Sequence, residues 1–194
     1  IGDWLSFKSG YGALFTQEDP FAFCSYVEED WAQLGCAWEF SKRIPSFFTN
    51  EDPELKTAHS LRLAIDAGAD FAQGRYLEDI VTSLAHSSAY QYVLREPEFF
   101  VQLCRKVSSL PNLQEKCIIG MMNGLLAGGR PENGPERAAR LCASDRISQR
   151  ERVACVESLT LNVQNSYNPL GMREVCQLFP QLAQASLAPW KICS

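Results

Sequence analysis

The sequence has few of the residues that commonly carry chemistry, and it has no long hydrophobic run. Only two histidines and three methionines occur among its 194 residues. The longest uncharged apolar stretch runs from Cys117 to Gly129, 13 residues that include Asn123. A membrane-spanning helix needs about 20 apolar residues. We therefore expect no transmembrane segment and interpret this stretch as a buried helix.

Motifs that bind nucleotides, activate a nucleophile or hold a catalytic metal are also missing. The sequence contains no phosphate-binding glycine loop, dinucleotide fingerprint, nucleophile elbow or two-histidine zinc helix. Its formal net charge of −5 disfavours nucleic acid as the main partner, because phosphate binding depends on surplus lysine and arginine. We expect no cofactor, no metal and no nucleic-acid partner.

Strand signals are scarce, whereas helical periodicity is widespread. No sustained alternation of β-branched residues occurs. Leu61, Ala64, Ile65, Gly68 and Phe71 follow the three-and-four spacing of a helix face. Prolines stand near the expected helix starts, where a missing amide hydrogen costs nothing. The sequence predicts an all-α fold with helices at about 20–32, 34–48, 53–72, 75–94, 97–108, 112–127, 135–143, 147–164, 170–179 and 181–188.

Eight cysteines occur as four sequence pairs: Cys24 and Cys36, Cys104 and Cys117, Cys142 and Cys155, and Cys176 and Cys193. Several cysteines recur at 38 residues, as Cys117 and Cys155 do, and such a period indicates a helical repeat. We expect helical hairpins stacked as a short solenoid within one domain, 1–194. Its parts would be an aromatic-rich segment at 1–48, a cysteine-free repeat at about 53–94 and cysteine-paired repeats at about 97–194.

Disulfides account for these pairs better than a metal site or free thiols. Zinc ligands within a pair stand about two to four residues apart, whereas these pairs are separated by 12, 13, 13 and 17 residues. Among about 105 possible connectivities, we expect pairing in sequence order, because Cys104 and Cys117 flank a turn-like stretch of a helix hairpin. The chain also begins at Ile1 without a leader, so we expect a mature periplasmic or extracellular protein.

This layout of cysteine-linked helix pairs resembles Sel1-like and tetratricopeptide-like repeat proteins, particularly bacterial members that link each helix pair by a disulfide. The resemblance covers about residues 20–194 and is one of layout, since the signature positions of neither repeat are met consistently. It implies a scaffold that binds other proteins.

Aromatic residues are concentrated at the start of the chain, where 12 of the 21 lie within residues 1–48. Such density is typical of a capping core or of a recognition surface, because tryptophan and tyrosine dominate interface hot spots. Core packing is the more ordinary interpretation. If any segment binds a partner, we expect it to be this one, through Trp4, Phe7, Tyr11, Trp31 and Trp38.

The two histidines, His59 and His86, both lie in the cysteine-free repeat. An acid–base pair with neighbouring carboxylates would favour a hydrolase, although two ordinary polar side chains explain the same positions. Our first hypothesis is a non-catalytic exported binding or scaffold protein with a protein partner or a larger assembly. The alternative is an exported hydrolase with its site near His59 and His86.

Overall fold

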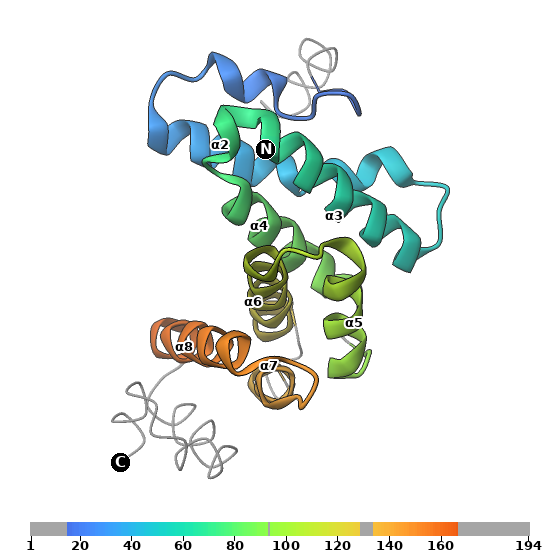
Figure 1. The fold of residues 1–194 in the computed structure, drawn as a ribbon, viewed down its shortest axis with the longest axis vertical. Helices are drawn as coiled ribbons and strands as arrows, with labels where there is room; N and C mark the ends of the chain where they lie inside the picture. The colour runs from blue at the N-terminus through green and yellow to red at the C-terminus, as the bar shows by residue number, and fades with distance from the viewer. Residues whose placement is uncertain (1–14, 93, 129–133, 167–194) are drawn as a thin grey trace. The chain divides into compact units, whose positions relative to one another are not determined.

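A computed structural model describes residues 15–92, 94–128 and 134–166, and all regular structure within these ranges is helical (Figure 1). This confirms the all-α prediction. The chain divides into two compact units, with the boundary between Leu84 and Ala85. None of the described helices is long and apolar enough to cross a membrane.

The first unit combines α-helices with short 3-10 helices. Its elements are η2 (Ala22–Tyr26), α2 (Asp30–Ser41), η3 (Ile44–Phe48), α3 (Pro53–Asp70), η4 (Phe71–Gly74) and the first part of α4 (Leu77–Ala89). The side chain of Asp52 starts α3 by accepting hydrogen bonds from the amides of Glu54 and Leu55, at 3.0 and 3.2 Å. Pro53 then occupies the first helical turn, where its missing amide is harmless.

Two expected helices of the first unit are wrong in their extent. The helix predicted at 20–32 is instead η2 and an extended link, because Val27 and Glu29 have extended backbone angles and α2 begins only at Asp30. The helix predicted at 34–48 ends at Ser41 and gives way to η3. Pro45 in η3 cannot donate a helical hydrogen bond, and its ring restricts the residue before it.

The second unit holds the end of α4 and two longer helix pairs. Its further elements are η5 (Tyr90–Tyr92), α5 (Pro97–Val107), α6 (Pro111–Gly128), α7 (Gly134–Ala143) and α8 (Gln149–Ser166). The helix predicted at 75–94 is therefore too long, since α4 stops at Ala89 and η5 follows. Helix α6 packs against α5, α7 and α8. The helices predicted at 170–179 and 181–188 lie outside the described residues.

Three disulfides confirm pairing in sequence order for the described cysteines. Cys24–Cys36 joins η2 to α2, Cys104–Cys117 joins α5 to α6, and Cys142–Cys155 joins α7 to α8. Their Cα–Cα distances of 5.6, 5.7 and 5.5 Å are ordinary for such bridges. Cys176 and Cys193 lie outside the described residues.

A close helix contact inside the second unit depends on Gly124 of α6. A Cβ atom at this position would meet the backbone carbonyl oxygen of His86 and would lie 2.6 Å from the Cβ of Ala89. Only glycine lets α6 approach the end of α4 this closely. On α6 as well, the side chain of Asn123 accepts hydrogen bonds from Ser158 and Asn162 of α8, at 3.3 and 2.9 Å.

Candidate functional site

The link between η2 and α2 presents two large aromatic rings to solvent. We call residues 26–31 the aromatic loop. Tyr26 and Trp31, at its two ends, keep 74% and 75% of their surface exposed. Between them, Glu28, Glu29 and Asp30 are also exposed. The loop therefore combines two exposed rings with three carboxylates.

Several interactions hold the aromatic loop against the body of its unit. The Cys24–Cys36 disulfide closes its base. The side-chain amide of Gln33 donates to the carbonyl oxygens of Cys24 and Val27, at 3.4 and 3.3 Å. The amide of Val27 donates to the Cys24 carbonyl at 3.2 Å. Its two rings are thus exposed on a backbone that is restrained on both sides.

Asp30 connects the aromatic loop to the segment before α4. Its Oδ1 atom accepts a hydrogen bond from Arg75 at 2.6 Å and one from the Tyr76 hydroxyl at 3.3 Å. Its backbone carbonyl also accepts from Tyr76, at 3.3 Å. The charge of Asp30 is thus balanced by Arg75, and the exposed carboxylates of Glu28 and Glu29 give the loop its acidic character.

Most other described aromatics of the N-terminal part pack on one another. Phe15 stacks on Phe47 and meets Phe40 edge-on, with ring centroids 4.6 and 5.4 Å apart. Phe21 is fully buried and lies 5.4 Å from Phe71. Core packing thus accounts for these phenylalanines, and the exposed rings of Tyr26 and Trp31 stand apart from them.

Five aromatics were predicted to bind a partner, and of the two that lie in the described residues Trp31 is strongly exposed. Trp38 is half-buried, and the Nζ atom of Lys42 lies 5.7 Å from the centroid of its ring. The backbone carbonyl of Trp38 accepts hydrogen bonds from the hydroxyls of Ser41 and Ser83, each at 2.8 Å. Trp4, Phe7 and Tyr11 lie outside the described residues. Tyr26 was not among the five, and the signal that could have found it is its place in the aromatic-rich segment 1–48.

The two histidines have separate local partners in different units. In the first unit, Nδ1 of His59 lies 2.9 and 2.8 Å from the two carboxylate oxygens of Glu51, and the Phe48 ring is 5.7 Å away. In the second unit, Nε2 of His86 lies 2.9 Å from the Tyr90 hydroxyl. Within the described ranges, no group of three or more His, Cys, Asp or Glu residues could hold a metal ion.

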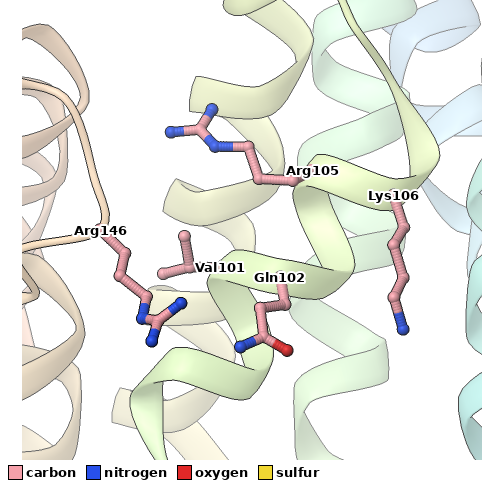
Figure 2. Close-up of a pocket in the computed structure, with 5 residues that line it drawn as sticks. All are labelled: Val101, Gln102, Arg105, Lys106 and Arg146. Atoms are coloured by element: carbon pink, nitrogen blue, oxygen red, sulfur yellow. The ribbon is translucent and has the colours of Figure 1, made fainter.

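A pocket of about 460 Å³ lies in the second unit (Figure 2). Val101, Gln102, Arg105 and Lys106 of α5 line it, together with Arg146 from the connection between α7 and α8. In Figure 2 the ends of Gln102, Lys106 and Arg146 point toward the bottom of the view, whereas the Arg105 guanidinium points to the upper left. Three of the five lining residues are cationic and none is acidic.

Arg105 is committed to a buried ion pair with Glu151 of α8. Its Nη1 and Nη2 atoms each lie 2.5 Å from one carboxylate oxygen of Glu151, a two-pronged geometry that arginine favours. The Ser148 amide donates to Glu151 at 2.7 Å. Burial raises the pKa of Glu151, but the hydrogen bonds from Arg105 and Ser148 outweigh it, and the pKa is lowered overall.

The same arginine also reaches α6. Arg105 donates to the side-chain carbonyl oxygen of Gln114, and the side-chain amide of Gln114 donates to the Ser108 backbone carbonyl at 2.6 Å. Arg105 therefore connects α5, α6 and α8, and its charge is paired with that of Glu151. The other two cationic side chains that line the pocket are Lys106 and Arg146.

No family model, no curated protein and no solved structure matches this chain. The all-helical layout with disulfides is therefore established by the structure alone, and membership in a Sel1-like or tetratricopeptide-like family remains a prediction.

The sequence carried little signal for the pocket. Arg105 and Lys106 stand in α5, whereas Arg146 follows α7, about 40 residues later. Arg146 alternates with acidic neighbours such as Asp145 and Glu151, a pattern typical of an ordinary solvated surface. The buried position of Glu151, only 3% exposed, removes one of these acids from the surface, and only the tertiary structure shows this.

Proposed function

We propose that this chain is a non-catalytic, exported binding or scaffold protein that engages a protein partner through the aromatic loop. The observation that carries this proposal is the exposure of Tyr26 and Trp31 on a restrained backbone. Tryptophan is usually well buried, and tryptophan and tyrosine are enriched at interface hot spots. A backbone that is already ordered loses less conformational entropy on binding than a free loop would.

The chemistry of the loop indicates the kind of partner. Glu28 and Glu29 are exposed between the two rings, while Asp30 is balanced by Arg75. A complementary surface would offer an apolar pocket for Trp31 and lysine or arginine side chains opposite the two glutamates. We therefore propose a protein partner with a basic surface patch.

The helix pairs would form the scaffold as a stacked array of hairpin repeats. Helices α6 and α8 are both 18 residues long, and each carries the second cysteine of a disulfide to the preceding helix. Repeats of this kind bury their apolar faces against their neighbours and present an extended surface.

Export is supported by the disulfides. Three bridges in a chain of this length are typical of an oxidising compartment. Each should add about 3 kcal/mol to stability by constraining the unfolded chain. The partner would therefore be met outside the cytoplasm, in the periplasm or the extracellular space.

Site-specific photocrosslinking tests this proposal on the full, oxidised chain. A photoreactive phenylalanine analogue at Glu28 should form an adduct with one exported protein, identified by mass spectrometry. Trp31→Ala and Tyr26→Ala should each weaken binding of that protein. For Trp31→Ala we expect about 30-fold or more, because hot-spot residues contribute about 2 kcal/mol or more.

The matched control uses Leu55 of α3, an apolar side chain that is 52% exposed outside the aromatic loop. A crosslinker at Leu55 should not give the same adduct, and Leu55→Ala should leave the affinity unchanged. Raising the salt concentration should slow association if charges guide the encounter. If Trp31→Ala and Tyr26→Ala both leave the affinity and the adduct unchanged, the aromatic loop is not the binding site.

A further inference from the structure

The pocket of the second unit contains one guanidinium, that of Arg146, that the described part of the fold does not pair. The guanidinium of Arg146 makes no hydrogen bond or ion pair with any residue in the described ranges. Within them, the backbone amide of Arg146 donates a hydrogen bond to the Ser144 hydroxyl. Arg146 and Lys106 are both exposed. In contrast to Arg105, which is bound to Glu151, the guanidinium of Arg146 has its donors unpaired as far as the described residues are concerned.

The polar ends of the pocket suit a single anionic group. Arg146 and Gln102 line the same pocket from two different elements, and in Figure 2 their polar ends extend toward the same side of the view. A guanidinium binds a carboxylate through two parallel hydrogen bonds, and an amide adds a neutral donor. Among the described residues, no acidic side chain lines the pocket to compete for these donors.

The rest of the pocket suits an apolar group. Val101, only 2% exposed, supplies methyl groups. The aliphatic stems of Arg105, Lys106 and Arg146 can cover apolar surface while their charged ends stay in water. A volume of about 460 Å³ lies within the usual range for small-molecule sites, roughly 300–1,000 Å³.

We propose that this pocket binds a small amphiphilic carboxylate: the carboxylate on Arg146 and Gln102, with Lys106 adding positive charge, and the apolar body on Val101 and the neighbouring aliphatic stems. This site is independent of the aromatic loop. It would take a ligand of the opposite charge to the partner proposed there, so the two binding activities can be tested separately.

The test titrates the oxidised full chain with octanoate and follows the Val101 methyl and Gln102 side-chain amide signals by NMR. Acetate supplies the charge without the apolar body, and 1-octanol supplies the body without the charge. We expect saturable shifts at both residues with octanoate and at least about tenfold weaker binding of each comparator, since one charge-assisted contact accounts for about a factor of ten.

Two variants assign the contacts. Arg146→Gln removes the guanidinium from an exposed position and should weaken octanoate binding by about tenfold or more. Gln102→Trp should block the pocket by filling it. The matched control is Arg140→Gln, which removes one exposed positive charge from α7 outside the pocket and should leave the affinity within twofold.

The proposal is overturned by any of three results. These are the absence of saturable octanoate binding, shifts that avoid Val101 and Gln102, and unchanged affinity in Arg146→Gln with its fold intact by circular dichroism. Equal affinity for octanoate and 1-octanol would show that the cations do not contribute, and would also overturn it. Inorganic phosphate binding as tightly as octanoate would do the same, because the apolar body would then be irrelevant.

Discussion

Two substitutions that break the ion pair between Arg105 and Glu151, Arg105→Met and Glu151→Gln, should lower the free energy of unfolding by unequal amounts. The carboxylate side chain is 4% exposed, whereas the Arg105 side chain is 34% exposed. Arg105→Met leaves a buried carboxylate without its main partner. Glu151→Gln leaves an arginine that water can reach. The first change should therefore be the more destabilising.

The magnitude follows from burial. Removing one partner of a buried pair costs about 3–5 kcal/mol. The Ser148 amide still donates to Glu151, and part of Arg105 is hydrated, so we expect the lower end, about 3 kcal/mol, for Arg105→Met. Glu151→Gln should cost about 1–2 kcal/mol, because an amide oxygen can still accept a hydrogen bond. The double variant Arg105→Met/Glu151→Gln should lose less than the sum of the two single changes.

The dependence on pH gives a sharper test. In the native protein the pKa of Glu151 is lowered. The stability that the ionised carboxylate contributes is therefore fully present above the unfolded carboxyl pKa of about 4.3. It is lost as the pH falls through the lower folded value. In Arg105→Met the main lowering partner is gone, and burial should raise the pKa of Glu151 instead. Acidification from pH 7 to 5 should then partly restore the stability of the variant.

Urea unfolding with the disulfides intact measures these differences, provided that the slope of the unfolding free energy against urea is the same for all variants. A loss of about 3 kcal/mol corresponds to a melting temperature lower by roughly 6–12 °C. Equal losses for Arg105→Met and Glu151→Gln would refute the reasoning. So would an Arg105→Met protein whose stability relative to the native chain declines further on acidification.

Two other changes test the packing of the second unit. Gly124→Ala places a Cβ against the His86 carbonyl and 2.6 Å from the Cβ of Ala89, so thermal melting should show a loss of about 1–3 kcal/mol despite the better helix propensity of alanine. A neutral or stabilised protein would show that the helices are not in such close contact. Replacing both Cys104 and Cys117 by Ala should cost about 3 kcal/mol in urea unfolding, and an unchanged midpoint would contradict a stabilising role for this bridge.

Local sequence patterns predicted the helices and the bridges because both depend on short-range geometry. Cys104 and Cys117 are separated by 13 residues, so a helix hairpin brings them together whatever the rest of the chain does. Prolines such as Pro53 and Pro97 mark helix starts through their own fixed backbone angle. The helix predicted at 34–48 was too long because the periodic pattern was followed through Pro45.

The sequence by itself determined the helical class, most helix starts and the order in which the described cysteines pair, since those properties are set within one or two turns of chain. Only the tertiary structure decided that Phe40 is buried and Trp31 exposed, although both stand in α2. It alone placed Arg146 beside Val101 and Arg105 against Glu151. The physical reason is that burial and charge pairing depend on which helix faces meet, and this is settled by packing over the whole unit.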